Sequence, residues 1–154
     1  MDLSNILRSG AVKSLSAVSS KKRLFHELAD LAAQNYDLRA SVVCSALQER
    51  ESLGPTGVGQ GIALPHARLD GLDQVHGLFI RIDKPVEFDA VDRQPVDLVF
   101  CLLAPEGAGV EHLKALAVVS RTMRDGALCA KLRANADPAT LHTILTERPA
   151  VRAA

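Results

Sequence analysis

The sequence is poor in aromatic side chains. It contains no tryptophan, one tyrosine and four phenylalanines among 154 residues. Hydrophobic residues nevertheless make up 47% of the chain, a share that is typical of globular proteins. The core must therefore consist mainly of Leu, Val, Ile and Ala, and a chain of this length is long enough to form one domain with a substantial core.

The sequence also lacks an excess of charge, because 18 basic residues balance 18 acidic ones. A chain without net charge has no overall field that would attract DNA, RNA or an anionic membrane. We therefore expect no nucleic-acid partner. Any anion that the protein recognises must be bound by a local site.

Cysteine is scarce. Cys44, Cys101 and Cys129 are odd in number, widely spaced and set among apolar residues. This pattern predicts buried free thiols and argues against a disulfide framework or a CxxC metal site.

Long hydrophobic runs are missing as well. The most apolar stretch, Val96–Ala104, is interrupted by Asp97 and is much too short to span a bilayer. The residues Met1–Ser4 lack the basic and apolar regions of a signal peptide. We therefore expect a cytoplasmic protein without direct insertion into a membrane.

Helical periodicity is present in several segments. Leu24, Phe25, Leu28 and Leu31 lie on one helical face after Ser19 and Ser20, which predicts a helix over residues 21–34. Asp37 is the expected N-cap of a second helix that runs to about Glu51 and is ended by Gly54-Pro55. Further helices are predicted for residues 110–124, after Asp125-Gly126, and from Pro138 with Asp137 as N-cap.

Two segments, residues 75–82 and 96–103, are typical of strands, and the second is so apolar that we expect it to be central in a sheet. Strands and helices alternate without a domain boundary or repeat, which predicts a single layered α/β domain. We assign residues 1–148 to this domain and residues 149–154 to a flexible C-terminal tail.

The segment Gly57–His66, with the sequence GVGQGIALPH, is the most informative in the chain. Glycines at three alternate positions let the backbone turn tightly and approach a ligand, and Pro65 stiffens the approach to His66. The segment therefore predicts a histidine at a strand end beside an N–H-rich loop, with Arg68 nearby. A neutral imidazole is a nucleophile at cellular pH, so a phosphoryl group is a suitable substrate. The glycine spacing fits neither a dinucleotide-binding fingerprint nor a P-loop.

Taken alone, two other residues have ordinary structural interpretations. Arg50 falls in the last turn of a predicted helix, where a cation complements the helix dipole. His112 shares an apolar helix face with Leu116 and Val119, which is typical of a packed, hydrogen-bonded histidine.

The segment Gly57–His66, together with Arg50-Glu51, closely resembles the active-site block of the enzyme IIA proteins of the phosphoenolpyruvate-dependent phosphotransferase system, in the fructose/mannitol class and its nitrogen-regulatory relatives. The resemblance continues through residues 84–92, 94–100 and 112–116, in the order and with the gaps of that family. It implies a three-layer α/β domain with a mixed β-sheet flanked by helices. The blocks at residues 50–51, 57–68 and 88–92 look most like the nitrogen-regulatory branch.

The resemblance implies that His66 accepts a phosphoryl group, with Arg50 and His112 beside it. Arg50 offers a bidentate fork to phosphate oxygens. His112 either hydrogen-bonds the transferring group or orients the ring of His66. The backbone N–H groups of Gly57, Gly59 and Gly61 are expected to line the anion. This chain has Pro55-Thr56 where the family usually has Ser-Thr, so that Thr56 alone supplies any hydroxyl contact, and Ala67 replaces a frequent glycine.

The implied donor is a histidine phosphocarrier protein of the nitrogen or the general type, and no cofactor or metal is expected. The recipients are regulated target proteins or a IIB domain. Because the chain ends shortly after its last predicted helix, we expect no fused IIB or IIC domain. A regulatory role is favoured over a sugar-transport component.

Two alternatives of other classes stay open at this point. One is a small zinc hydrolase that uses His66, His112 and a carboxylate such as Glu111 or Asp97. The other is an interaction module that has lost phosphorylation.

Overall fold

The computed structural model describes residues 2–147. Its helices are α1 (Lys21–Tyr36), α2 (Ala40–Ser52), α3 (Gly109–Met123), α4 (Gly126–Arg133) and α5 (Pro138–Thr146), preceded by two 3₁₀ turns, η1 (Leu3–Asn5) and η2 (Ser9–Ala11). Its strands are β1 (Val12–Leu15), β2 (Gly57–Gly59), β3 (Ile62–Ala63), β4 (His66–Leu69), β5 (His76–Val86) and β6 (Val96–Pro105). The tail predicted for residues 149–154 lies outside the described residues.

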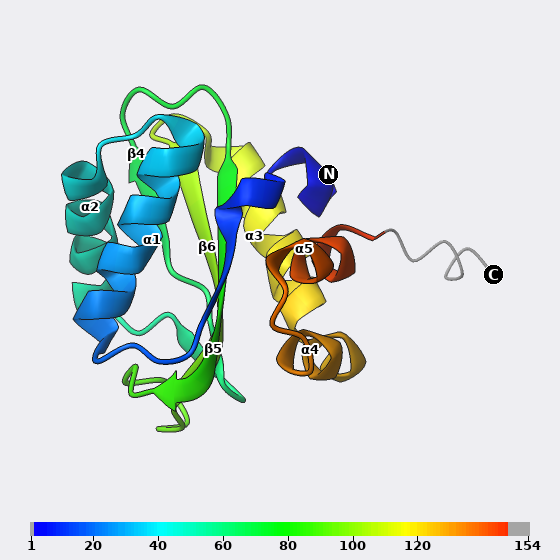
Figure 1. The fold of residues 1–154 in the computed structure, drawn as a ribbon. Coiled ribbons are helices and arrows are strands. Elements are labelled where there is room, and N and C mark those ends of the chain that lie inside the picture. The colour runs from blue at the N-terminus through cyan, green and yellow to red at the C-terminus, as the bar shows by residue number, and fades with distance from the viewer. Residues whose placement is uncertain (1, 148–154) are drawn as a thin grey trace.

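One sheet separates two helical layers. Helices α1 and α2 cover one face of the sheet, and α3, α4 and α5 cover the other (Figure 1). The six strands form a mixed sheet, since β5 runs antiparallel to β6, whereas β3 and β4 run parallel to it. The predicted three-layer α/β domain with a mixed sheet flanked by helices is confirmed.

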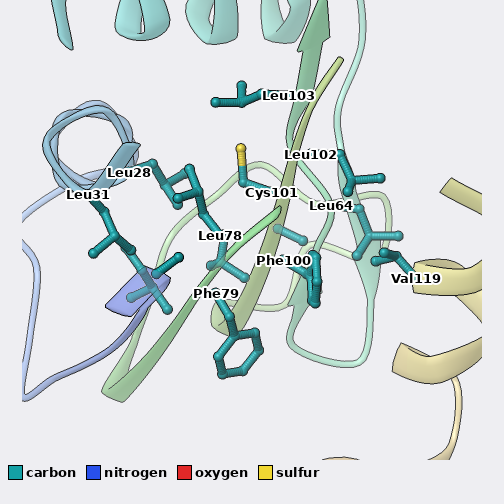
Figure 2. Close-up of a cluster of buried hydrophobic side chains, with 14 of the residues drawn as sticks. Leu28, Leu31, Leu64, Leu78, Phe79, Phe100, Cys101, Leu102, Leu103 and Val119 are labelled. Carbon is teal, nitrogen blue, oxygen red and sulfur yellow. The ribbon is translucent and has the colours of Figure 1, made fainter. Parts of the chain in front are cut away.

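The strand β6 is the centre of this sheet. It pairs with β5 along one side and with β3 and then β4 along the other, as expected from its apolar sequence. Leu28 and Leu31 of α1 pack on one side of the β5–β6 pair, and Val119 of α3 packs on the other (Figure 2). Aliphatic side chains make up most of both interfaces, as the shortage of aromatic residues predicts, and the buried phenylalanines Phe79 and Phe100 lie among them.

Three helices begin at a residue whose side chain accepts from the first turn, and one of these residues, Asp137, was predicted as an N-cap. Ser20 accepts a hydrogen bond from the Arg23 N–H, Asp125 from the Ala127 and Leu128 N–H groups, and Asp137 from the Thr140 N–H. The prediction that Asp37 caps α2 is wrong. Asp37 ends α1 in a left-handed conformation with φ of 56°, which aspartate tolerates better than most residues.

The strand prediction was incomplete. Strands β1, β2, β3 and β4 were not predicted, and β5 continues four residues beyond the expected Ile82. The missed strands contain only two to four residues each. Such short segments have too few residues to show an alternating pattern, and their pairing depends on distant strands.

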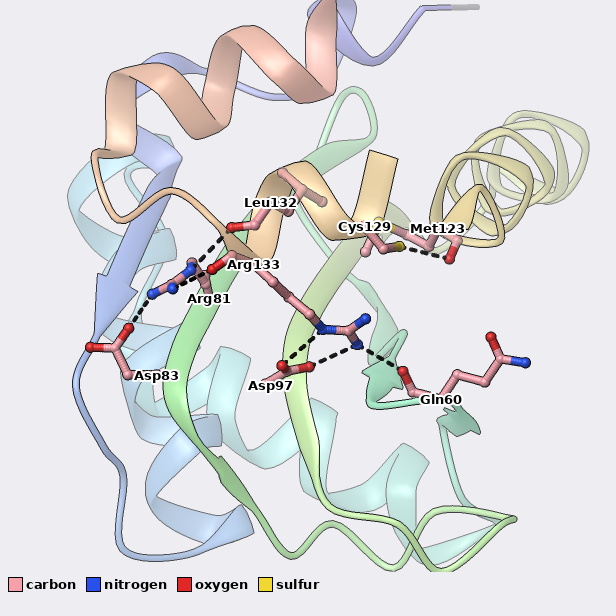
Figure 3. Close-up of polar contacts among 8 residues, drawn as sticks. All are labelled: Gln60, Arg81, Asp83, Asp97, Met123, Cys129, Leu132 and Arg133. Atoms are coloured by element: carbon pink, nitrogen blue, oxygen red, sulfur yellow. Dashed lines mark hydrogen bonds and ion pairs between the residues drawn. The ribbon is translucent and has the colours of Figure 1, made fainter. Parts of the chain in front are cut away.

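Polar side chains join α4 to the sheet, at β5, at the start of β6 and at the turn between β2 and β3. The guanidinium group of Arg133 donates to both carboxylate oxygens of Asp97, at 2.9 and 3.0 Å, and to the Gln60 carbonyl at 2.8 Å (Figure 3). Arg81 donates to the Leu132 and Arg133 carbonyls at 3.0 and 2.6 Å, which caps the C-terminus of α4 (Figure 3). We refer to Gln60, Arg81, Asp97 and Arg133 as the Arg133 network.

Candidate functional site

His66 is the first residue of β4, and its backbone lies opposite Leu102 of β6. The sequence placed His66 at a strand end, and in the structure it stands at the N-terminal end of β4, after β3 has ended at Ala63. The reason is Pro65, which has no N–H to donate to a strand ladder and so separates β3 from β4. The Pro65 carbonyl still accepts from the Leu102 N–H at 3.0 Å, and this bond fixes the chain directly before His66.

The imidazole ring of His66 has a defined tautomer. Its Nδ1 atom lies 2.9 Å from the Leu64 carbonyl oxygen. A carbonyl oxygen only accepts hydrogen bonds, so Nδ1 must carry the hydrogen. In the neutral ring, the Nε2 atom is then left with an unprotonated lone pair, which is the form that a nucleophile requires.

A cavity of about 500 Å³ lies between α2, β4 and α3 and includes this ring. It brings together the three residues predicted to carry the chemistry, Arg50, His66 and His112. The remaining lining residues are Ala46, Glu49, Leu53, Ala67, Arg68, Glu106, Leu113 and Leu116.

His112 faces His66 from α3. The ring centroids are 5.6 Å apart and the ring planes are nearly perpendicular. Arg68 donates from Nε to Nδ1 of His112 at 3.4 Å, so the proton of a neutral His112 ring is on Nε2. Burial lowers the pKa of His112, and the neighbouring His66 and Arg68 lower it further. His112 is therefore a neutral N–H donor near neutral pH.

Two arginines contribute positive charge to the cavity. Arg50 lies in the last turn of α2, as predicted, and its Nη1 atom donates to the Gly54 carbonyl at 3.0 Å. Within residues 2–147, neither Arg50 nor Arg68 lies within ion-pair distance of a carboxylate, although Glu49 and Glu106 also line the cavity. A guanidinium group without a carboxylate partner is suited to an anionic ligand.

Arg68 was predicted to lie near His66 but was not assigned a role in the site. It follows His66 by two positions, and residues two apart on a strand point to the same face. Leu53 and Leu113 were also not predicted. Their side chains are 81% and 65% exposed, so the cavity has an apolar rim.

The structure does not bring Thr56, Gly57, Gly59 or Gly61 to the lining of this cavity. Thr56 is buried and donates from its N–H and its hydroxyl to the Glu51 carboxylate. Gly57 and Gly59 bound strand β2. Gly61 lies against the Arg133 network, where a Cβ atom would be 2.7 Å from Arg133 and 2.8 Å from Asp97. Contacts from these four residues to phosphate stay a prediction that the shape of the cavity does not support.

The zinc alternative required a carboxylate beside both histidines. Asp97 instead pairs with Arg133, and Glu111 lies 4.0 Å from Lys114. Among the described residues, no group of three or more His, Cys, Asp or Glu side chains is arranged to hold a metal ion. Likewise, none of the helices within residues 2–147 has both the length and the hydropathy needed to cross a membrane.

Residues 5–148 match the family model described as "Phosphoenolpyruvate-dependent sugar phosphotransferase system, EIIA 2". Among curated proteins, the chain is 44% identical to a nitrogen regulatory protein of Bradyrhizobium diazoefficiens, over 99% of this chain and 100% of that protein.

Solved structures similar to this chain are also IIA proteins. Nitrogen regulatory protein IIA-Ntr from Neisseria meningitidis superposes with a TM-score of 0.84 and 40% identity, covering 92% of this chain and 97% of that one. The IIAMTL component of an Escherichia coli complex with phosphorylated enzyme IIBMTL has a TM-score of 0.76 at 17% identity, covering 93% of this chain and all of that one. At that identity the second match shows the fold alone.

Proposed function

Because this chain belongs to the EIIA 2 family of the phosphoenolpyruvate-dependent phosphotransferase system, we propose that Nε2 of His66 is the atom that accepts its phosphoryl group. The prediction of a phosphotransferase-system IIA protein of the nitrogen-regulatory type is confirmed by the family match and by relatives of that name at 44% and 40% identity. The identity of the acceptor atom is the part that we add.

The observation that supports this assignment is the hydrogen bond from Nδ1 of His66 to the Leu64 carbonyl. It leaves the Nε2 lone pair as the nucleophile. The N–P bond of a phosphohistidine donor breaks as a new bond forms between phosphorus and Nε2, and the lone pair returns to the donor ring. Little covalent chemistry is left for the protein, so positioning and charge stabilisation provide most of the rate.

The surrounding residues are suited to that task. Arg50 and Arg68 supply positive charge to the phosphoryl oxygens. His112 is neutral and carries its proton on Nε2, since its Nδ1 atom accepts from Arg68. The ring of His66 is already oriented by Leu64. Of the two roles predicted for His112, the geometry therefore favours hydrogen bonding to the transferring group.

We propose a phosphohistidine of a phosphocarrier protein as the donor. The apolar rim formed by Leu53 and Leu113 is suited to a protein partner that brings its own phosphoryl group to the cavity. Phosphorylation adds a charge of about −1.5 to −2 at the cavity, which changes the affinity of any regulated protein that binds over it. A IIB domain is the alternative recipient, as in the complex of mannitol IIA with phosphorylated IIB.

The test is incubation with phosphoenolpyruvate, enzyme I and purified phosphocarriers of the nitrogen and general types. We expect the wild-type protein to gain one acid-labile, base-stable phosphate, and His66→Ala to gain none. Phosphorylation of His66→Ala would show that the acceptor is another residue. An unphosphorylated wild-type protein would instead favour an interaction module.

A second experiment separates regulation from sugar transport. A deletion strain is complemented with wild type, His66→Ala or His66→Asp, and its growth is compared on different nitrogen sources and sugars. The regulatory role should be abandoned if the defect is confined to uptake of one sugar and a purified IIB domain takes phosphate rapidly from His66.

A further inference from the structure

A series of hydrogen bonds connects a partly buried ion pair to the ring of His66. The Lys21 Nζ atom lies 2.7 Å from the Glu51 carboxylate, whose side chain is only 8% exposed. That carboxylate accepts from both the N–H and the hydroxyl of Thr56. The Thr56 carbonyl accepts from the Leu64 N–H at 2.9 Å. The Leu64 carbonyl accepts from Nδ1 of His66, also at 2.9 Å.

The charges of this ion pair lie at unfavourable ends of their own helices. Lys21 is the first residue of α1, at the positive end of the helix dipole. Glu51 is in the last turn of α2, at the negative end. Helix capping therefore does not account for either residue. Lys21 is held further by the Phe88 ring, whose centroid is 4.6 Å from Nζ.

The carboxylate of Glu51 restrains Thr56 at two points. Thr56 is 4% exposed, so its N–H and hydroxyl have little access to water that might replace the carboxylate. Loss of these bonds would leave two buried donors without an acceptor, which proteins avoid. Thr56 would have to move, and the Leu64 N–H bonded to its carbonyl would move with it.

We propose that Glu51, held by Lys21, is a positioning residue that fixes the Nδ1–H tautomer of His66 through Thr56 and Leu64. Glu51 thereby keeps Nε2 unprotonated and directed for attack. The residue acts without contacting the ring or the phosphoryl group. This inference rests on the proposed function, because it explains how the acceptor atom is kept ready. It also gives Thr56 a role in the unphosphorylated protein.

The experiment measures the tautomer of His66 and the rate of phosphoryl transfer in Glu51→Gln. Glutamine keeps only one acceptor oxygen, so its amide nitrogen must face either the Thr56 hydroxyl or the position shared by Lys21 and the Thr56 N–H, and one of these bonds to the carboxylate is lost. Long-range proton–nitrogen NMR of the unphosphorylated protein, at a pH where the ring is neutral, reports which ring nitrogen carries hydrogen. Signals of His66 are identified by their loss in His66→Ala. We expect the Nδ1–H population to fall and the transfer rate to drop about 10- to 100-fold, as for a misplaced reacting group.

The matched control is Glu27→Gln, which removes a 3.0 Å ion pair with Lys13 that contacts no residue of the series. It should leave both the tautomer and the rate as in wild type. The proposal is overturned if Glu51→Gln keeps the Nδ1–H tautomer and transfers within about twofold of the Glu27→Gln rate.

Thr56→Val is the second variant, for the case that Glu51→Gln does not fold. It removes the hydroxyl and keeps the shape, and we expect a smaller tautomer shift in the same direction. A residue that only contacted phosphate would slow transfer without moving the tautomer, and this result in Thr56→Val would contradict the proposal. If wild type accepted no phosphate, the proposed function would fail, whereas a tautomer shift in Glu51→Gln alone would still support the positioning role.

Discussion

Arginines build two regions of this molecule in opposite ways. In the Arg133 network, one guanidinium group is bonded to the carboxylate of Asp97 and the other to the final carbonyls of α4. In the cavity beside His66, Arg50 donates to a carbonyl and Arg68 to an imidazole nitrogen, and within residues 2–147 neither pairs with a carboxylate. The first arrangement neutralises charge and connects elements, whereas the second leaves positive charge for a ligand. The bonding partners of these arginines therefore distinguish structural from ligand-binding roles better than their positions in the sequence do.

The glycine-rich segment before His66 also contributes to both of these regions. Gly61, with φ of 80°, lies where any Cβ atom would displace Arg133 or Asp97. The glycine-rich segment therefore allows the β2–β3 turn to approach the Arg133 network. The segment that follows it delivers His66 to the cavity. One stretch of sequence thus serves both regions, because Gly61 lies against the Arg133 network and His66 lines the cavity.

The largest effect is expected for Arg50→Ala. Loss of a charge-assisted contact to the transferring group removes about 1.5–4 kcal/mol and slows transfer by roughly one to three orders of magnitude. Thermal unfolding should hardly change, because the Arg50 side chain makes a single hydrogen bond within residues 2–147, to the Gly54 carbonyl. Single-turnover transfer from a phosphorylated carrier measures the rate, and calorimetry measures stability. If the variant were strongly destabilised but its folded fraction transferred at the normal rate, Arg50 would instead act as a capping residue of α2.

Arg133→Met is the corresponding variant in the Arg133 network, and the opposite result is expected for it. It removes three hydrogen bonds and leaves Asp97, whose side chain is 18% exposed, without its partner. We expect a loss of about 1–3 kcal/mol in the free energy of unfolding and a transfer rate equal to that of wild type. Urea denaturation measures the first quantity. A slowed rate in the fully folded variant would contradict the separation of the two regions.

The sequence predicted the parts of this comparison that depend on local patterns. Helical periodicity located α1, α3 and α5, an apolar run identified β6 as central, and the segment before His66 identified that residue. The contact between Arg68 and His112 joins residues 44 positions apart, and the bond from Arg133 to Gln60 spans 73 positions. Such pairings depend on the register of β4 and β6 and on the docking of α4, so no local pattern reveals them. The predicted phosphate contacts of Gly57, Gly59 and Gly61 likewise rest on a local pattern, which does not show that Gly61 lies against Arg133.

Gly61→Ala tests that reassignment. A methyl group at a positive φ costs about 1–2 kcal/mol, and here it also displaces the Arg133 side chain. We therefore expect lower stability, measured by urea denaturation, together with normal phosphoryl transfer. Gly71→Ala is a suitable control, because φ is 88° there but no atom lies within 4 Å of the added Cβ. A transfer defect in Gly61→Ala without loss of stability would support the original prediction that this glycine binds phosphate.

The smallest effect concerns Arg68 and the pKa of His112. Burial, His66 and Arg68 together hold this pKa below its ordinary value of 6.5. In the folded protein His112 therefore binds its proton less readily than in the unfolded chain, so stability falls as the pH decreases through 6.5 towards the folded-state pKa.

Arg68→Met removes one of the three causes, which raises the pKa of His112 part of the way back and makes the acid-induced loss of stability smaller. NMR titration of the His112 ring gives the pKa, and urea denaturation at neutral and mildly acidic pH gives the stability. Arg121→Met, in the last turn of the same helix, should change neither. An unchanged pKa in Arg68→Met would mean that the charge of Arg68 does not act on His112.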